Sequence, residues 1–388
     1  MPKTRPNEPC PCESGKKFKK CCRDKPGSLS AAQRPKFSRE FINRFFARYN
    51  ELKKTRLQTG PQIQTDTSFG RLFGVGGSLY RGETKRTFHQ FLIDHLIQVL
   101  SPRWYETESE RPQEEWHPIL RWIRGSEQYL NAATSKAIYG QIHGFHPDGN
   151  GLALLTLADD VYQLAHIMKT PDKPILKRLR DRRSFQGARY EIFTASVLAR
   201  CGYEVDFVDE KTKKTPDILA TRNVDALSVM AEAKSRHRPE THTHIANRAD
   251  AQELQADVRR LIREALDQNP GNMPFLIFVD VNLPFSQTRP PAWEKEVTDF
   301  IHRDGRERTG YDLLSGLVVT NYSWHYEGTN PSSGAETLFI PNQAAKYPLP
   351  TTFCDALVRA LQEYGAIPDD EVRKMNLNEC FPGLPPLT

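Results

Sequence analysis

Apolar residues recur every three to four positions along much of the chain, which is the spacing of one face of an α-helix. The clearest case is the range 84–100, where Phe88, Leu92 and Leu96 share a face. The same spacing predicts further helices over 38–49, 114–134, 152–168, 247–268, 293–303 and 351–366. We therefore expect an all-helical region before residue 184, in which the glycine-containing range 61–82 is a connecting loop.

Two sets of polar residues belong to this helical region. Asp159 and Asp160 are expected on the polar side of the helix at 152–168. His143, His146 and Asp148 precede that helix, and side chains of these types can bind a metal ion. Because glycine and proline interrupt this stretch, we favour a turn over a metal site.

Short apolar runs in the second half of the chain predict β-strands. An alternating run at 203–208 is followed by runs at 216–221 and 227–234, with a polar turn between them that favours a hairpin. Continuous apolar runs at 275–279 and 314–320 suit buried strands that pair in parallel, because a long crossover separates them. The expected fold is an α/β (α+β) core in which helices flank a central mixed sheet.

Candidate chemistry gathers on this hairpin. Pairing of its strands would bring Asp217 near Glu232, and strand alternation points Lys234 the same way as Glu232. Two carboxylates repel each other unless a cation joins them or one pKa rises. Carboxylate oxygens are ligands that suit Mg²⁺ or Mn²⁺, so the pattern predicts a divalent-cation site. The simplest alternative is a surface hairpin with an ordinary Glu/Lys pair.

Residues 184–285 resemble the PD-(D/E)xK nuclease superfamily, which has the restriction-endonuclease-like fold. The Pro-Asp of the family motif falls on Pro216-Asp217, its Glu-x-Lys falls on Glu232-Ala233-Lys234, and its additional helix glutamate falls on Glu191. The resemblance implies hydrolysis of a phosphodiester, usually in DNA. It makes Asp217 and Glu232 ligands of magnesium or manganese, joined by Glu191 directly or through water. It makes Lys234 the residue that orients or deprotonates the attacking water, or that stabilises the charge developing on phosphorus.

Basic residues surround the predicted site in the sequence. Arg236 and Arg238 come two and four residues after Lys234 and are candidates to bind phosphate. His242 and His244 come later in the same loop, which we interpret as polar rather than metal-binding. The range 173–183 holds six Lys or Arg and could contact a nucleic-acid backbone.

Four cysteines near the start of the chain predict a structural zinc site. Cys10, Cys12, Cys21 and Cys22 have the spacing C-x-C-x8-C-C, and four thiolates form a closed tetrahedral site for Zn²⁺. With the intervening Ser-Gly-Lys-Lys-Phe-Lys-Lys, the segment resembles the SEC-C motif, except that Glu13 stands where glycine is usual. The resemblance implies an accessory knuckle that recruits the rest of the chain to a partner.

Length and composition indicate how many domains the chain has and what kind of partner it could bind. The 388 residues suggest two or three domains, and a net charge of +6 permits a nucleic-acid partner. No apolar run reaches 18 residues and no signal peptide is recognisable, so we expect a cytoplasmic protein without membrane association. The expected divisions are a zinc knuckle (1–25), a linker (26–36), a helical domain (37–183), a nuclease-like domain (184–350) and a C-terminal helix and tail (351–388).

The sequence predicts a magnesium-dependent endodeoxyribonuclease that could serve defence or repair, with DNA as its partner. It leaves two alternatives open: a nuclease that acts on RNA, and a non-catalytic zinc-containing adaptor that keeps a nuclease-like fold. A protein partner could bind through the knuckle or the helical domain. A homodimer is also left open.

Overall fold

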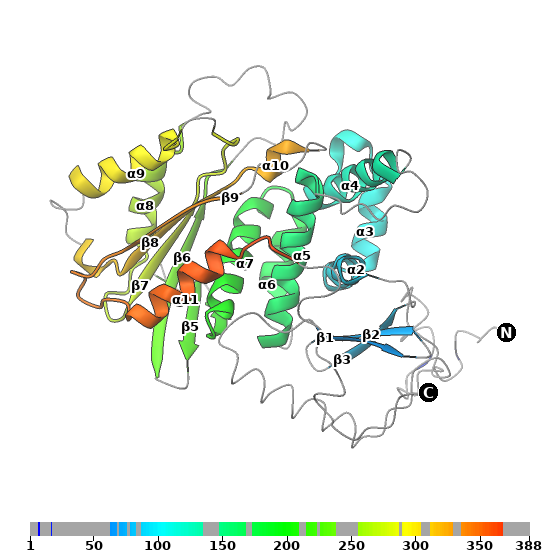
Figure 1. Ribbon diagram of the computed structural model, residues 1–388, viewed down its shortest axis with the longest axis horizontal. Helices are drawn as coiled ribbons and strands as arrows, with labels where there is room; N and C mark the ends of the chain where they lie inside the picture. The colour runs from blue at the N-terminus through cyan, green and yellow to red at the C-terminus, as the bar shows by residue number, and fades with distance from the viewer. Residues whose placement is uncertain are drawn as a thin grey trace. The chain divides into compact units, whose positions relative to one another are not determined.

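The computed structural model (Figure 1) describes residues 7, 17, 63–67, 70–75, 78–82, 87–134, 147–167, 173–208, 215–222, 226–237, 255–286, 289–303, 311–328 and 335–367. The chain separates into two compact units, of which one includes Pro61–Glu110 and the other includes Arg111–Ile367. In this part of the chain, no helix has both the length and the apolar character needed to cross a membrane.

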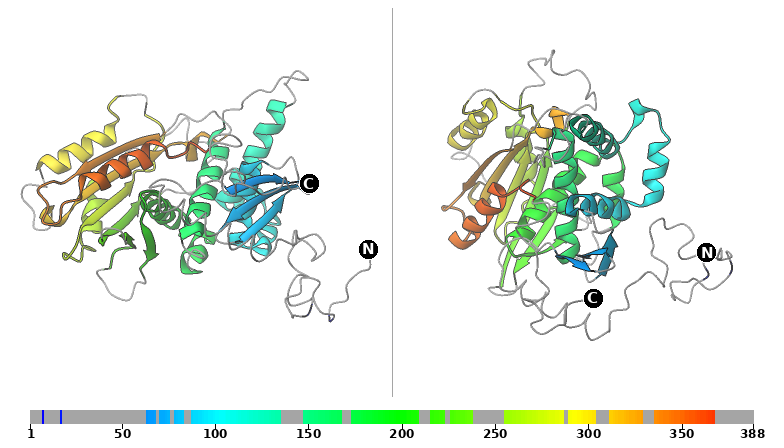
Figure 2. Two further views of the ribbon diagram at one scale, coloured as in Figure 1. Left: turned by 60° about the horizontal axis from the view of Figure 1, so that its bottom comes forward. Right: turned by 45° about the vertical axis from the view of Figure 1, so that its right-hand side comes forward.

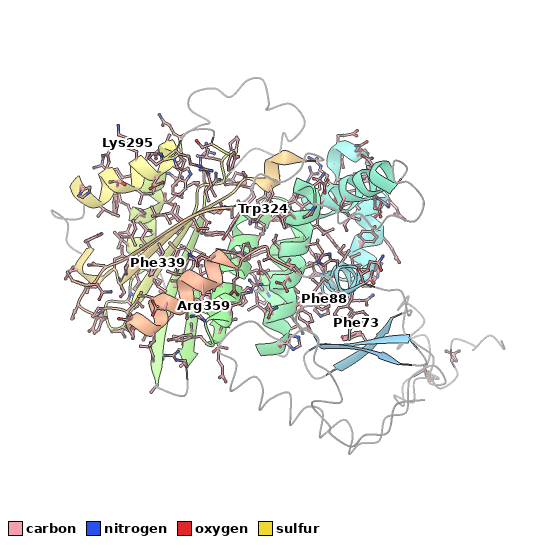
Figure 3. All side chains as sticks on the ribbon, in the orientation of Figure 1. Phe73, Phe88, Lys295, Trp324, Phe339 and Arg359 are labelled. Atoms are coloured by element: carbon pink, nitrogen blue, oxygen red, sulfur yellow. The ribbon has the colours of Figure 1, made fainter. Side chains whose placement is uncertain are left out.

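The smaller unit combines a three-stranded antiparallel sheet with two helices. Its elements are β1 (Ile63–Thr67), β2 (Gly70–Val75), β3 (Ser78–Gly82), α2 (Phe88–Leu100) and α3 (Pro102–Ser109). Helix α2 begins with a capping box, in which Thr87 and Gln90 each accept a hydrogen bond from the other's backbone N–H. Phe73 of β2 faces α2, where its ring stacks on Phe91 at 4.3 Å between centroids and also approaches Phe88 (Figure 3).

The expectation of an all-helical region with a loop at 61–82 is wrong, because this range forms β1, β2 and β3. Val75 at the end of β2 pairs with Ser78 at the start of β3. The two residues between them in the sequence are Gly76-Gly77, a dipeptide typical of a hairpin turn. Glycines within β2 interrupt the alternation of apolar and polar residues, so the sequence pattern did not predict a strand there.

The larger unit is built on a six-stranded mixed sheet in the order β4-β5-β6-β7-β8-β9. Its strands are β4 (Glu204–Phe207), β5 (Ile218–Arg222), β6 (Leu227–Ser235), β7 (Phe275–Asp280), β8 (Gly316–Tyr322) and β9 (Ala335–Pro341). Strands β4, β5 and β6 are antiparallel neighbours, β6, β7 and β8 run parallel, and β9 is antiparallel to β8. The predicted hairpin, the parallel pairing and the mixed sheet are confirmed.

Helices cover both faces of this sheet (Figure 2). The helices described in this unit are α4 (Pro118–Thr134), α5 (Gly149–Ile167), α6 (Lys173–Arg180), α7 (Phe185–Arg200), α8 (Val258–Leu266), α9 (Ala292–Arg303), α10 (Trp324–Glu327) and α11 (Thr351–Gln362), with short 3₁₀ turns η3 (Gln113–Glu115) and η5 (Tyr311–Leu313). The order α7-β4-β5-β6-α8-β7 is the predicted αβββαβ order. Gly202, with φ of 88°, takes the left-handed conformation that lets the chain leave α7 for β4.

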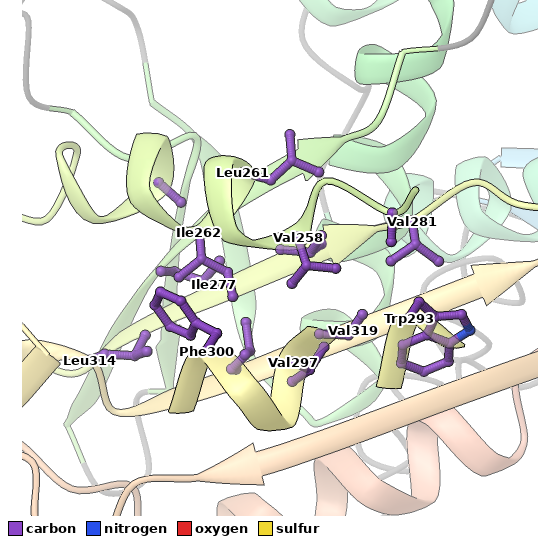
Figure 4. Packing of buried hydrophobic residues seen from close by; sticks show 14 of the residues in the cluster. Val258, Leu261, Ile262, Ile277, Val281, Trp293, Val297, Phe300, Leu314 and Val319 are labelled. Atoms are coloured by element: carbon purple, nitrogen blue, oxygen red, sulfur yellow. The ribbon is translucent and has the colours of Figure 1, made fainter. Parts of the chain in front are cut away.

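Strand alternation assigns each residue of β7 to one face of the sheet. Phe275, Ile277 and Val279 belong to a hydrophobic cluster with α8 and α9 (Figure 4). Phe278 lies on the opposite face, where its ring centroid is 6.4 Å from that of Phe193 on α7. We call these two surfaces the α8/α9 face and the α7 face.

The outer part of the α8/α9 face, towards the edge strand β4, remains open to solvent. On β4, Glu204 and Asp206 are exposed while Val205 between them is buried. Asp206 pairs with Leu219 of β5, which in turn pairs with Met230 of β6. Met230 packs partly against the cluster under α8 and α9, so Glu204 and Asp206 lie on the α8/α9 face.

Helix α5 packs against α7 and is buried on almost every side. Asp160 of α5 is only 1% exposed, which corrects our expectation that it lies on a polar side. Its carboxylate accepts hydrogen bonds from Ser196 and Tyr364, both at 2.7 Å, and pairs with Arg200 at 3.2 Å. A helix buried this completely has no polar face, so its polar residues must find partners inside the protein.

Tyr364→Phe tests this buried network. The change removes a donor from a buried carboxylate, and we expect the free energy of unfolding to fall by about 1–3 kcal/mol. Tyr322→Phe is the matched control, because the Tyr322 hydroxyl is buried and has no hydrogen-bond partner among the described residues. Denaturant titration should find the control neutral or slightly stabilised, and equal losses in the two variants would contradict this account.

Candidate functional site

Asp217 and Glu232 lie side by side, as the hairpin pattern predicts. Ile218 pairs with Ala231 across the β5-β6 ladder, so the preceding residue, Asp217, comes opposite Glu232. The backbone N–H of Asp217 donates to Glu232 Oε2 at 3.1 Å, and the backbone N–H of Ala233 donates to Asp217 Oδ2 at 2.9 Å. These two hydrogen bonds fix the carboxylates at one end of the hairpin.

Lys234 completes this group on the α8/α9 face. Glu232 and Lys234 alternate along β6 with Met230, which places all three side chains on that face. Lys234 Nζ lies 2.5 Å from Glu232 Oε1. The Glu232 side chain is 3% exposed and that of Lys234 is 26% exposed, while Asp217 is half-buried, so solvent reaches the site at Lys234 and Asp217 but not at Glu232.

The electrostatics of the site follow from this packing. Burial raises the pKa of Glu232 and the neighbouring Asp217 raises it further, to about 7, although Lys234 acts in the opposite direction. Burial alone would lower the pKa of Lys234, but Glu232, Asp217 and Glu264 together hold it above its usual value. Lys234 is therefore an ammonium at neutral pH. Its positive charge lies beside the carboxyl groups of Asp217 and Glu232.

Glu191 is not brought to this group. It lies on α7, and its carboxylate accepts hydrogen bonds from Arg178 Nη1 at 2.7 Å and Nη2 at 2.5 Å. Other residues of α7 point towards the α7 face of the sheet, where Arg189 pairs with Asp280 of β7. Across the described part of the chain, no group of three or more His, Cys, Asp or Glu is arranged to hold a metal ion. The metal-binding role of Glu191 stays a prediction.

Of the two candidate phosphate-binding residues, the structure describes Arg236. It directly follows β6, where its N–H donates to the carbonyl of Asp280 at 2.9 Å and its carbonyl accepts from Asn282 Nδ2 at 3.0 Å. Its backbone is therefore fixed two residues beyond Lys234. Arg238, His242 and His244 lie outside the described residues.

A buried polar network braces the strands next to the site, and sequence reasoning missed it. Asp280 ends the apolar run of β7 and is 1% exposed. Arg189 donates to its carboxylate at 2.5 Å and Ser235 does so at 3.2 Å. An aspartate that closes a continuous apolar strand was the available signal, because such a residue needs a buried partner.

The basic range 173–183 includes helix α6. Its apolar residues Ile175, Leu176 and Leu179 are buried, while Lys173 and Lys177 are exposed. The arrangement leaves part of the positive charge facing solvent, as the amphipathic spacing predicts.

Asp148 caps the start of α5, since its Oδ1 accepts the backbone N–H of Gly151 at 2.8 Å. This is the role of a helix N-cap residue, which accounts for the acidic side chain without a metal ion. His143 and His146 fall outside the described residues.

A model of the SEC-C motif matches residues 7–24. The match contains Cys10, Cys12, Cys21 and Cys22 and confirms the resemblance of this segment to that motif. The four cysteines lie outside the residues that the structure describes, so zinc binding stays a prediction. Comparison with curated proteins gave no match, and neither did comparison with solved structures. Because the motif match ends at residue 24, the resemblance of residues 184–285 to PD-(D/E)xK nucleases also stays a prediction.

The Arg178–Glu191 pair should contribute to stability, because the Glu191 side chain is 8% exposed. Arg178→Met would remove the two hydrogen bonds that the guanidinium donates to this carboxylate, and we expect a loss of about 1–3 kcal/mol in the free energy of unfolding. Adding Glu191→Gln should recover part of that loss, which gives a positive coupling in a double-mutant cycle. Strictly additive effects in denaturant titrations would show that the two side chains do not interact.

Glu232 should make stability depend on pH in metal-free solution. Its pKa of about 7 in the folded chain lies above the ordinary 4.5, so the folded state holds the proton more tightly. This contribution to stability is complete below about pH 4.5 and is lost as the pH rises through about 7. Glu232→Gln should therefore unfold with a flatter dependence on pH between 5 and 8 than the wild type. Parallel curves in chelator-containing buffer would rule out the raised pKa.

Proposed function

We propose that this chain is an endonuclease that uses a divalent metal ion to hydrolyse phosphodiester bonds of DNA. One observation carries the proposal: Asp217 and Glu232 are juxtaposed across the β5-β6 ladder, and Lys234 lies against them. This is the residue set that a PD-(D/E)xK site requires. The αβββαβ order of the elements around it supports the same reading.

The donor set suits magnesium or manganese. Mg²⁺ typically takes one or two carboxylates from a protein and completes its octahedron with waters and substrate phosphates. Asp217 and Glu232 would supply the carboxylates, and the carbonyl of Ala233 is a further candidate ligand. Glu191 could join them only after its carboxylate leaves Arg178.

The ion, when bound, would polarise a phosphoryl oxygen and favour ionisation of a water. The side chain of Lys234 would then serve as a cation rather than as a base. Its pKa is raised, so it keeps its proton at neutral pH and can donate to an oxygen on which negative charge develops. Asp280 would act indirectly, because its carboxylate accepts a hydrogen bond from Ser235 at the end of β6 and pairs with Arg189 of α7, which ties β6, β7 and α7 together beside the site.

Positive residues would position the substrate. Arg236 directly follows β6, and Arg238 comes two residues later in the sequence; both are candidates to hold phosphates next to the cleaved bond. The exposed lysines of α6 would add nonspecific affinity for a polyanion.

The cysteine knuckle would bind zinc and serve recruitment. Four thiolates fill a tetrahedral zinc site and leave no position for a substrate, so its role would be structural. Recruitment to a partner at foreign or damaged DNA would fit a nuclease of defence or repair.

Cleavage assays test the function directly. Plasmid DNA and RNA should be incubated with the full chain in Mg²⁺, Mn²⁺ or EDTA, and we expect metal-dependent nicking of DNA. Asp217→Asn, Glu232→Gln and Lys234→Met should each lower the rate at least about 100-fold, because each removes a group that acts on the charged transition state. Lys295→Met, at an exposed position on α9, is the control for loss of one positive charge (Figure 3).

Other results of the cleavage assay would favour a different function or different site residues. Cleavage of RNA alone would change the substrate, and cleavage by all three site variants at the wild-type rate would refute the assigned residues. No cleavage of either polymer in any metal would favour the non-catalytic adaptor.

A further inference from the structure

We propose that Lys234 is the built-in counter-ion of the Asp217–Glu232 pair, and that it occupies the position on Glu232 that a divalent cation must take. Lysine and metal ion would then compete, so the ammonium is released towards the substrate only in the metal-loaded site. The inference deepens the proposed function and rests on its metal site.

The contacts of Glu232 identify the group that must leave. Its Oε2 accepts the backbone N–H of Asp217, and its Oε1 pairs with Lys234 Nζ. The first donor belongs to the backbone next to the β5-β6 ladder and cannot withdraw without disturbing the hairpin. The second donor ends a flexible side chain that is 26% exposed. A divalent cation bound to Glu232 would be repelled by the ammonium on the same buried carboxylate, and of the two donors only the lysine can move away, so binding of the cation favours its displacement.

Burial explains why the chain keeps a cation there at all. A carboxylate that is 3% exposed is costly without a counter-ion, and a second carboxylate beside it adds repulsion. Lys234 relieves both penalties in the metal-free protein. The same attraction must be broken when a divalent ion binds, so the lysine lowers the affinity of the site for metal.

Glu264 of α8 lies over the same face of the sheet, and its negative charge favours the ammonium form of Lys234. The carboxylate of Glu264 itself pairs with Arg260 at 2.6 Å. The ion pair that holds Lys234 in the metal-free protein is therefore the one with Glu232.

Calorimetric titration with MnCl₂ tests the competition. Chelator-treated full-length protein should be compared with Lys234→Met and with the charge-loss control Lys295→Met at one pH. We expect Lys234→Met to bind Mn²⁺ about tenfold more tightly, a change worth about 1.4 kcal/mol, and Lys295→Met to match the wild type. Glu232→Gln should bind Mn²⁺ weakly in both lysine backgrounds. Equal or weaker binding by Lys234→Met would overturn the proposal.

Amine labelling of the wild type gives a second measurement that needs no variant. An acylating reagent should modify Lys234 several-fold faster when Mn²⁺ is added, because the amine loses its ion pair, while the exposed Lys295 keeps its rate. Unchanged labelling of Lys234 at saturating Mn²⁺ would contradict displacement, even where Lys234→Met fails to fold.

The two proposals fail separately. Tighter Mn²⁺ binding by Lys234→Met without cleavage of DNA or RNA by the wild type would keep the competing lysine and reject the nuclease. DNA cleavage by the wild type with unchanged Mn²⁺ affinity in Lys234→Met would keep the nuclease and reject the competition. Absence of Mn²⁺ binding in both proteins would reject the metal site and the competition together.

Discussion

The candidate site depends on the register between β5 and β6. Ile218 pairs with Ala231, and only this register brings Asp217 opposite Glu232. A shift by one residue would send the side chain of Asp217 to the α7 face, because side chains alternate along a strand. The parallel pairing of β6 with β7 and the hydrogen bond from Ser235 of β6 to Asp280 of β7 hold β6 in place from the other side. Backbone hydrogen bonds therefore position the charges of the site.

The sequence predicted best which side chains of the strands lie on the same face of the sheet. Alternation along the runs at 216–221 and 227–234 was enough to place Glu232 and Lys234 on one face and to bring Asp217 next to them. The parallel strands β7 and β8 followed from the long segment between two continuous apolar runs. These inferences hold because a strand has only two faces, so a pattern of period two fixes the direction of every side chain.

The partners of polar side chains on helices were harder to predict, as Glu191 shows. Side chains point in all directions around a buried helix, and α7 packs against the sheet, α5 and α6. The sequence pattern therefore did not show which of these neighbours Glu191 would contact. The structure pairs it with Arg178 of α6. Asp160 was misplaced for a related reason, because α5 has no exposed face for an acidic residue. The strands of the smaller unit were missed because the glycines in β2 weaken its alternation.

The acidic edge of the sheet has a consequence for the direction in which a polyanion could approach. Glu204 and Asp206 project from β4 on the same face as Asp217 and Glu232, and both are exposed. Coulombic repulsion would keep a phosphate chain away from β4 and displace it towards the C-terminal end of β6, where Arg236 follows. A polyanion would therefore meet an asymmetric field and would lie nearer the end of β6 than the edge strand β4.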